Sequence, residues 1–303
     1  MPILVEKLFE GPVDVVGDIH GEIDALLTLM GHLGYDEAGH NPSGRRLVFV
    51  GDLTDRGPDS PAVVDLVTEL LACERAQCVL GNHDLNILLG TTKHDNGWYF
   101  GHEFSSEGEL VPQKLADDGI RARVQSLFAS LPLALERPDL RVVHAAWNAN
   151  AIESLPPEAS VAELFKEHRA RIDVELMARD ADELERGLCH QIDNPVKMIT
   201  SGPEERIETP FESSGKVRFQ RRVEWWPDYR GPLCVFGHYS LPPERPRDNP
   251  LAFCVDFNVG KRWRERRETS ATGPFRRTRL AAFRFPERVV MFDDGNSQLW
   301  SVH

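Results

Sequence analysis

"RLVFVGDLTDRGPDSPAVVDLVTELLACERAQCVLGN", residues 46–82, contains a strand, helix and strand pattern. The apolar runs that begin at residues 46 and 78 are typical of buried strands, because they are rich in Val, Leu and Phe and end at glycine. Between them, residues 60–72 keep apolar side chains at helical spacing, at Val63, Leu66, Val67 and Leu70. Strand, helix and strand in this order indicate an α/β fold.

Polar residues follow each predicted strand directly. The stretches "VDVVGDIHGE" (13–22) and "VLGNHDLN" (79–86) repeat the order of residues 46–60, an apolar run, a glycine and then a polar cluster. Three later runs, "RVVHAA" (141–146), "LCVFGH" (233–238) and "LAFCVDF" (251–257), are also predicted strands. Loops beyond the carboxyl ends of strands in an α/β sheet converge in one crevice. The residues expected to meet there are Asp18, His20, Asp52, Asp55, Arg56, Asn82, His83, His144 and His238.

This collection of side chains predicts a metal site. Carboxylate, imidazole and amide oxygen suit divalent ions such as Mn²⁺, Fe or Zn²⁺, and the lack of a nearby cysteine counts against a structural zinc site. Taken alone, His144 would more often be a hydrogen-bonded core histidine than a ligand, and a ligand role is favoured only beside the other clusters. The remaining histidines are interpreted as surface or structural residues.

Composition limits the other classes of function. The chain has 303 residues, 41% hydrophobic content and a formal net charge of −13, which fits a folded protein without broad affinity for nucleic acid. No apolar run is long enough to cross a membrane and no leader pattern is recognised, so a cytoplasmic location is expected. Five cysteines without a CxxC pair indicate reduced thiols rather than a disulfide framework.

The rest of the chain gives weaker predictions. Residues 22–34 and about 157–188 are predicted helices, and about 201–232 is expected to be irregular. No linker divides the sequence, so one domain over residues 1–303 is predicted.

The motifs "GDIHG", "GDLTDRG", "GNHD", "VVHAAW" and "VFGHYS" resemble, in that order, those of the metallophosphoesterases, and within them the bacterial type of the phosphoprotein phosphatase branch. The tail "FCVDFNVGK" with "LAAFRFPE" resembles that of diadenosine tetraphosphatases and of the phosphatase module of polynucleotide kinase-phosphatases. The resemblance implies a four-layer sandwich, two mixed sheets flanked by helices, with a dinuclear metal site at the strand ends.

By position, the resemblance implies that Asp18 and His20 hold one ion, that Asn82, His144 and His238 hold the other, and that Asp52 bridges them. Two divalent ions, with Mn²⁺ favoured over Fe or Zn²⁺, would then supply a bridging hydroxide for attack on phosphorus. Arg56 would bind the phosphate, and His83, oriented by Asp55, would protonate the leaving oxygen.

Several positions keep alternatives. Asp84 is interpreted as a helix cap, and Asp256 either supports a metal ligand from behind or caps a turn, with the supporting role favoured. A second phosphate-binding arginine is expected among Arg206, Arg221 and Arg222. Residues 150–232 are predicted to form a lid or specificity insertion.

The segment 260–279 carries eight Lys or Arg residues. It is interpreted as a solvated loop that balances neighbouring acids, with a clamp for an anionic substrate as the alternative, in which Trp263 would offer a stacking face.

Three functions follow. The first is hydrolysis of phosphomonoesters, on phosphoserine or phosphothreonine proteins or on small molecules. The second is hydrolysis of dinucleoside tetraphosphates or phosphodiesters, with a nucleotide or RNA end as partner. The third is a catalytically inactive binding module that keeps the fold. No membrane partner is expected for any of the three. Asp55 favours the first, because diadenosine tetraphosphatases often have Ala there, and the complete set of motif residues disfavours the third.

Overall fold

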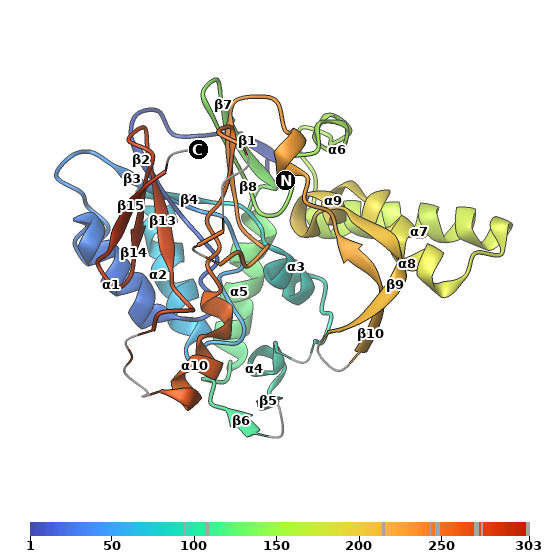
Figure 1. The fold of residues 1–303 in the computed structure, drawn as a ribbon, viewed down its shortest axis with the longest axis horizontal. Helices are drawn as coiled ribbons and strands as arrows, with labels where there is room; N and C mark the ends of the chain where they lie inside the picture. Colours follow the sequence, from blue (N-terminus) through green and yellow to red (C-terminus); the bar gives the residue numbers. More distant parts are fainter. Residues whose placement is uncertain are drawn as a thin grey trace.

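The computed structural model describes residues 1–93, 95–106, 109–213, 216–242, 244–245, 249–269, 273 and 275–300. His94, His303 and residues 270–272 and 274 of the basic segment lie outside this described part. Two mixed β-sheets with helices on their outer faces form the centre of the fold (Figure 1). The predicted fold class, two mixed sheets flanked by helices, is confirmed.

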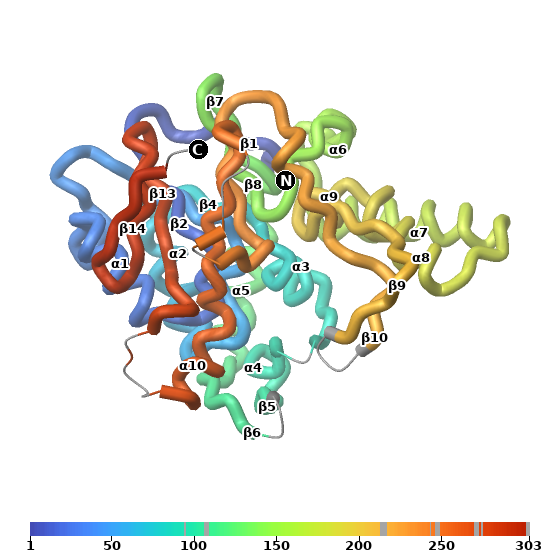
Figure 2. Tube along the Cα trace, in the orientation of Figure 1, coloured from blue at the N-terminus to red at the C-terminus, as the bar shows by residue number. Residues whose placement is uncertain are grey.

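One sheet has six strands in the order β15-β14-β13-β2-β3-β4. Strands β2, β3 and β4 are parallel, whereas β13 runs antiparallel to β2 and to β14. Figure 2 shows that this sheet combines segments far apart in the sequence, because the red strand β13 lies beside the blue strand β2. Its strands are β2 (Val13–Val16), β3 (Arg46–Phe49), β4 (Ala76–Cys78), β13 (Ala281–Phe285), β14 (Val289–Phe292) and β15 (Ser297–Leu299).

The predicted strand at residue 78 is displaced toward the N-terminus. Strand β4 ends at Cys78, although Val79 and Leu80 remain fully buried. The backbone N–H of Leu80 donates to the carbonyl of Pro132 at 2.8 Å rather than to β3, so the chain has already left the ladder. An apolar run indicates burial rather than strand pairing. Here the buried residues continue past the end of the strand, so the run predicts the wrong end.

The other sheet has five strands in the order β1-β7-β8-β11-β12. Strands β8, β11 and β12 are parallel, and β7 pairs antiparallel with β8. The strands are β1 (Val5–Lys7), β7 (Ala134–Arg137), β8 (Leu140–Val143), β11 (Leu233–Phe236) and β12 (Ala252–Cys254).

Alternate residues of the strands build two separate cores. Val15 and Val48 of the first sheet and Val142 of the second belong to one buried cluster, which fills the space between the sheets. Their neighbours Val16 and Phe49 belong to the larger cluster under the helices. Side chains of a strand point alternately to its two faces, so both faces of β2 and β3 are covered.

The helices that follow the first strands match the predicted periodicity. Helix α1 (Ile23–Leu33) covers the predicted segment, and α2 (Ser60–Ala72) agrees with it at both ends. Asp59 starts α2, because its side chain accepts the N–H of Ala62 at 2.9 Å. The other helices near these sheets are α3 (Asn82–Leu88), α4 (Gly97–Phe100) and α5 (Asp118–Ser130).

The predicted helix over 157–188 is wrong in its continuity. The chain forms α7 (Val161–Arg179) and then α8 (Glu183–Ile192). Asp180 takes a left-handed conformation with φ of 49° and ends α7, and the Asp182 side chain accepts the N–H of Glu185 at 2.7 Å to start α8. Aspartate tolerates both roles, so a break needs neither Gly nor Pro. Short helices flank this pair, α6 (Ala149–Glu153) and α9 (Pro195–Ser201).

The irregular structure expected for about 201–232 is also wrong. An antiparallel ribbon is formed there by β9 (Glu204–Ser213) and β10 (Lys216–Arg222), followed by the 3-10 turn η1 (Trp226–Asp228). Charged cross-strand neighbours such as Glu205 and Arg221 replace a clear apolar face, which removes the alternation that predicts a strand. Whether residues 150–232 act as a lid stays a prediction.

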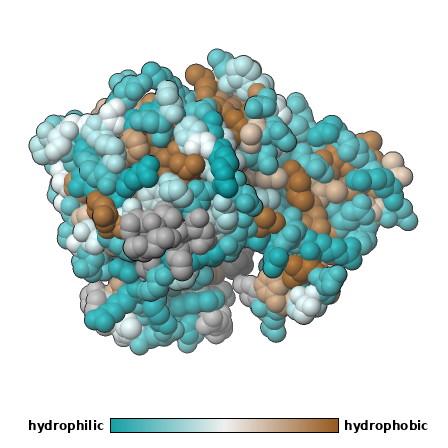
Figure 3. All heavy atoms as spheres, turned by 45° about the horizontal axis from the view of Figure 1, so that its top comes forward, coloured by the Kyte–Doolittle hydropathy of each residue, from teal (hydrophilic) through white to brown (hydrophobic). Residues whose placement is uncertain are grey.

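Four small elements complete the described structure near the C-terminal basic segment. Strands β5 (Phe104–Ser106) and β6 (Glu109–Val111) form a hairpin, and the turn η2 (Val259–Lys261) leads into helix α10 (Arg262–Glu268). No helix in the described residues is both long and apolar enough to cross a membrane. Hydrophilic residues dominate the face seen in Figure 3, with apolar ones in small separate groups.

Candidate metal and phosphate site

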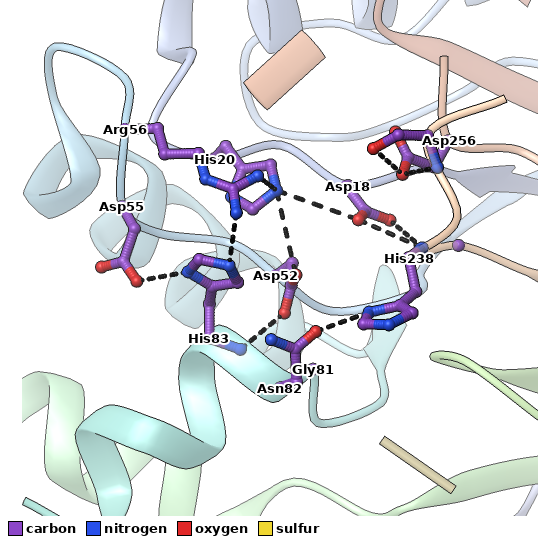
Figure 4. Close-up of polar contacts among 12 residues, drawn as sticks. Asp18, His20, Asp52, Asp55, Arg56, Gly81, Asn82, His83, His238 and Asp256 are labelled. Atoms are coloured by element: carbon purple, nitrogen blue, oxygen red, sulfur yellow. Dashed lines mark hydrogen bonds and ion pairs between the residues drawn. The ribbon is translucent and has the colours of Figure 1, made fainter. Parts of the chain in front are cut away.

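The polar residues that follow the predicted strands meet at one place, beyond the ends of strands from both sheets (Figure 4). Asp18 and Asp52 follow β2 and β3, and Asn82 opens α3. His144 and His238 follow β8 and β11 of the other sheet. The cluster is buried, with Asp18 and Asp52 each 2% exposed.

Backbone carbonyls fix the orientation of two of the imidazoles. His20 Nδ1 lies 3.0 Å from the carbonyl oxygen of Thr54, and His144 Nδ1 lies 2.8 Å from that of Val50. A carbonyl can only accept, so each Nδ1 carries its proton and donates. In its neutral form, a ring held this way directs the lone pair of Nε2 into the cluster, as a metal ligand requires.

Asp52 lies between the two groups of donors. Its Oδ2 is 3.8 Å from His20 Nε2, and its Oδ1 is 3.4 Å from His144 Nε2. One carboxylate therefore directs one oxygen toward each histidine, the arrangement a bridging ligand needs.

The donor atoms fit bound cations. Asn82 Oδ1 lies 3.1 Å from His144 Nε2 and 2.7 Å from His238 Nδ1, with Asp52 Oδ1 beside them. Because His144 Nδ1 already donates to a carbonyl, its Nε2 and the surrounding oxygens are all acceptors unless a proton or a metal ion lies among them. Among the described residues, three clusters of carboxylates and histidines have ligand atoms within 4.8 Å of one another. They are His20 with Asp52 and His83, Asp52 with His144 and His238, and Asp55 with His83 and Asp95.

The pKa values of the three histidines shift in different directions, according to the charges around each ring. Burial opposes the charged form of His144, but the charge and hydrogen bond of Asp52 outweigh it and raise the pKa to about 9. Burial and the nearby Arg56 hold the pKa of His20 well below its usual range, and burial with Arg222 and His144 does the same for His238. Neutral imidazoles at His20 and His238 are in the form that binds metals.

Close approach explains two glycines of the motifs. A Cβ on Gly81 would lie 2.2 Å from Asp52 Oδ1, and one on Gly237 would lie 2.1 Å from Asp18 Oδ1. Both contacts are closer than atoms tolerate, so only glycine lets these two carboxylates lie where they do.

A second group, His83, Asp55 and Arg56, lies beside His20. His83 Nδ1 is 2.6 Å from Asp55 Oδ2, while Arg56 donates from Nη2 to His83 Nε2 at 2.9 Å. Burial and Arg56 lower the pKa of His83, but the carboxylates of Asp52, Asp95 and Asp55 outweigh them and give a net increase. Asp55 and Arg56 have positive φ values of 76° and 66°, conformations that cost non-glycine residues about 1–3 kcal/mol and cluster at functional sites.

The sequence-based prediction missed two residues that contact this group. Asp95 Oδ2 accepts the Nε–H of Arg56 at 2.9 Å, and Trp98 Nε1 donates to Asp55 Oδ1 at 2.7 Å. Both residues follow α3 in the sequence, and neither Asp95 nor Trp98 belongs to a recognised motif. The only signal was an acidic and an aromatic residue shortly after "GNHD", which many surface loops share.

Asp84 does more than the predicted helix cap. It accepts the N–H of Gly81 at 3.1 Å, as a residue in the first turn of α3 can, and it also accepts the N–H groups of Asp52 at 2.8 Å and Leu53 at 3.1 Å. This fully buried carboxylate therefore ties the start of α3 to the loop after β3.

The three candidate arginines separate in space. Arg222 Nη1 donates to the carbonyl of His238 at 3.0 Å, which brings its guanidinium to the cluster. Arg221 pairs with Glu205 at 2.7 Å on the exposed ribbon, and Arg206 lines a cavity beside Glu185 and Cys189 of α8. Of the three, the structure brings only Arg222 to the candidate ligands.

Asp256 lies behind the His238 loop. It accepts the backbone N–H and the hydroxyl of Ser240 at 2.6 and 3.0 Å, and the N–H of Asn258 at 3.0 Å. It therefore contacts the loop rather than a ligand side chain, and a role in supporting His238 stays a prediction.

The basic segment is largely paired with acids where it is described. Arg262 pairs with Asp293 at 2.7 Å, Arg266 with the buried Glu22, and Arg267 with Glu109 at 2.7 Å. The stacking face on Trp263, which belonged to the alternative interpretation as a clamp, is wrong, because this side chain is 7% exposed and packs against Phe104 and Val111. These contacts agree with charge balance, although the residues form a helix rather than a solvated loop.

Comparison with known proteins agrees with this geometry. The calcineurin-like phosphoesterase family model matches residues 11–238, which hold every predicted metal ligand. The chain belongs to the calcineurin-like phosphoesterase family. The predicted class of enzyme, a phosphoester hydrolase, is thereby confirmed at the level of the family, whose members use a dinuclear divalent metal site.

Curated relatives of this phosphoesterase match over shorter stretches. A bis(5'-nucleosyl)-tetraphosphatase PrpE of Halalkalibacterium halodurans is 47% identical over 73 residues, which are 23% of this chain and 30% of the relative. The corresponding protein of Bacillus velezensis is 34% identical over 145 residues, 46% of this chain and 58% of the relative. The chain therefore spans less than two thirds of the length of either relative.

Solved structures agree on the fold. A cold-active protein-tyrosine phosphatase of a psychrophilic Shewanella superposes with a TM-score of 0.54 at 18% identity, covering 99% of this phosphoesterase and 83% of the other chain. At that identity the likeness concerns the fold alone.

Proposed function

We propose that this phosphoesterase hydrolyses phosphomonoesters, using two divalent metal ions and a general acid. Asp18 and His20 would hold one ion, Asn82, His144 and His238 the other, and Asp52 both. Bound there, the ions would neutralise phosphate oxygens and lower the pKa of an attacking water. The mixed oxygen and nitrogen donors suit Mn²⁺, Fe and Zn²⁺ alike. Mn²⁺ is the first ion to test, because the resemblance favours it.

The chain's own residues supply the remaining steps. The planar fork of Arg56 would bind two phosphate oxygens, and Arg222 is the candidate for a second arginine contact. A phosphate oxygen that takes the hydrogen bond of Arg56 Nη2 releases His83 Nε2, which can then carry a proton to the leaving oxygen. Asp55 keeps Nδ1 protonated and the ring oriented.

The observation that carries this proposal is the 2.6 Å contact between His83 Nδ1 and Asp55 beside the metal-donor cluster. An alkoxide is a poor leaving group and needs a proton in the transition state, so an intact acid favours phosphomonoesters. A nucleotide that leaves through its own phosphate needs this help less.

A second candidate is hydrolysis of dinucleoside tetraphosphates, supported by the names of the two curated relatives. The test is one substrate panel on Mn²⁺-loaded protein: p-nitrophenyl phosphate, its bis ester, a phosphoserine peptide and diadenosine tetraphosphate. Phosphomonoester turnover well above the other rates supports the first candidate. Selective cleavage of the tetraphosphate replaces it with the second, and a cytoplasmic location would suit either substrate.

A further inference from the structure

Asp95 is a buried carboxylate at the phosphate side of the site that no motif explains. Its side chain is 3% exposed, and its Oδ2 accepts the Nε–H of Arg56 at 2.9 Å. A buried charge is costly unless it is paired, and Arg56 supplies a pairing charge.

The contact uses only one edge of the guanidinium. With Nε on Asp95, the two terminal nitrogens of Arg56 remain directed at the centre of the site, Nη1 at 3.2 Å from His20 Nε2 and Nη2 at 2.9 Å from His83 Nε2. Figure 4 shows the guanidinium extending over His20 toward His83. These terminal N–H groups are the fork that binds two oxygens of one phosphate.

Asp55 is the other carboxylate of this group, but both of its oxygens are already engaged. Oδ2 bonds with His83 Nδ1 at 2.6 Å, and Oδ1 accepts from Trp98 Nε1 at 2.7 Å. Asp55 therefore holds the imidazole and Asp95 the guanidinium, and Asp95 Oδ2 also lies 3.8 Å from His83 Nδ1.

We propose that Asp95 is a positioning residue for phosphate binding, which fixes Arg56 through Nε so that its two terminal nitrogens face the phosphate. Without the anchor, the long arginine side chain would have to lose rotamer freedom each time a phosphate binds. This inference rests on the proposed role of Arg56, and it concerns anions with a terminal phosphate, whether monoester or inorganic phosphate.

A double-mutant cycle tests it with inorganic phosphate as the probe. Phosphate is titrated into the Mn²⁺-loaded full chain by calorimetry, with wild type, Asp95→Ala, Arg56→Ala and the double variant. We expect Asp95→Ala to weaken phosphate binding about tenfold in the wild-type background, the size of one to two hydrogen bonds to a charged group. In the Arg56→Ala background the same change should alter binding less than twofold, because its effect passes through Arg56.

Asp95→Asn distinguishes the loss of the hydrogen-bond acceptor from the loss of the negative charge. The amide keeps an oxygen that can accept Nε–H, so it should restore part of the binding lost in Asp95→Ala. Asp65→Ala is the control, since it breaks an exposed carboxylate–arginine pair with Arg123 and should leave phosphate binding unchanged.

The outcomes are distinct. An equal loss from Asp95→Ala in both Arg56 backgrounds, or no loss at all, would overturn the proposal. Circular dichroism and metal content of each variant detect a folding or metal-loading defect. If Asp95→Ala has such a defect, the change in phosphate binding is measured with Asp95→Asn instead. Phosphate binding needs no turnover, so an inactive chain would disprove the proposed function while leaving this test intact.

Discussion

Asp52 directs its two oxygens at His20 and His144, on opposite sides of the cluster. Replacing it with Asn keeps the shape but removes the charge that would offset two adjacent dications, so at least one ion should be lost. We expect Asp52→Asn to lower turnover of p-nitrophenyl phosphate roughly a hundredfold or more. Elemental analysis of the purified variant measures the ions per chain, and circular dichroism checks the fold. Two ions with near-normal turnover would rule out the bridging role.

His83 gives a prediction that depends on the leaving group. His83→Asn should slow a phosphoserine peptide by about 10²–10⁴-fold, the usual contribution of a general acid. The loss on p-nitrophenyl phosphate should be much smaller, because its phenolate leaves without a proton. Steady-state rates on both substrates at equal metal content make the comparison, and equal losses would remove His83 from the acid role.

At the scale of residues, the predicted ligands meet because each follows a strand and carries a chemistry that metals recognise. Asp95 could not be found this way, since its contact with Arg56 depends on how the chain turns after α3. Trp263 failed for a related reason. An aromatic residue among arginines suggested an exposed face, but packing against Phe104 and Val111 buries it.

At the scale of elements, the turn after β11 makes a prediction through Gly237. A methyl group there would lie 2.1 Å from Asp18 Oδ1 and 2.8 Å from the side chain of Val50. Gly237→Ala should therefore displace Asp18 and weaken metal binding at least tenfold, with a loss of stability of about 1–3 kcal/mol from overpacking. Gly31→Ala is the matched control, since nothing lies within 4 Å of its added methyl, and in α1 it should stabilise by about 0.5–1 kcal/mol. Manganese titration and thermal melts of both variants decide, and unchanged metal affinity in Gly237→Ala would count against the close packing.

Helices α1 and α2 were predictable because their apolar faces pack on a sheet and leave a clear period. The separate helix α8 and the β9–β10 ribbon were not predictable, each for a different reason. Asp180 and Asp182 break a helix without glycine or proline, and the ribbon has charged pairs where a buried strand would show apolar residues.

At the scale of the whole molecule, Asp14 joins distant parts of the six-stranded sheet. This fully buried carboxylate accepts from the Tyr35 hydroxyl at 2.8 Å, from Arg45 at 2.9 and 3.0 Å, and from Arg284 of β13 at 3.0 Å. Asp14→Ala would leave two arginines without this partner, and we expect a loss of about 3–5 kcal/mol in the free energy of unfolding.

The control for Asp14→Ala is Asp65→Ala, whose pair with Arg123 is half exposed and should contribute less than about 1 kcal/mol. Urea unfolding followed by circular dichroism measures both variants. Similar midpoints for the two would show that the buried network contributes no more than a surface pair.

The two-sheet architecture itself was expected only from the resemblance. The strand, helix and strand pattern of 46–82 gives parallel neighbours within one sheet, but it says nothing about a second sheet packed on the first. That arrangement depends on pairings between residues far apart in sequence, such as β13 with β2 and β11 with β8.

The candidate ligands come from both sheets, Asp18, Asp52 and Asn82 from one side and His144 and His238 from the other. The ion assigned to Asp52, Asn82, His144 and His238 would therefore also be a cross-link between the two halves of the core. By mass action, a ligand that binds only the folded chain adds about 1.4 kcal/mol to stability for each tenfold rise of its free concentration above the dissociation constant. The melting temperature of this protein should then report the free concentration of manganese, and a chelator should loosen the contact between the sheets as well as stop the chemistry.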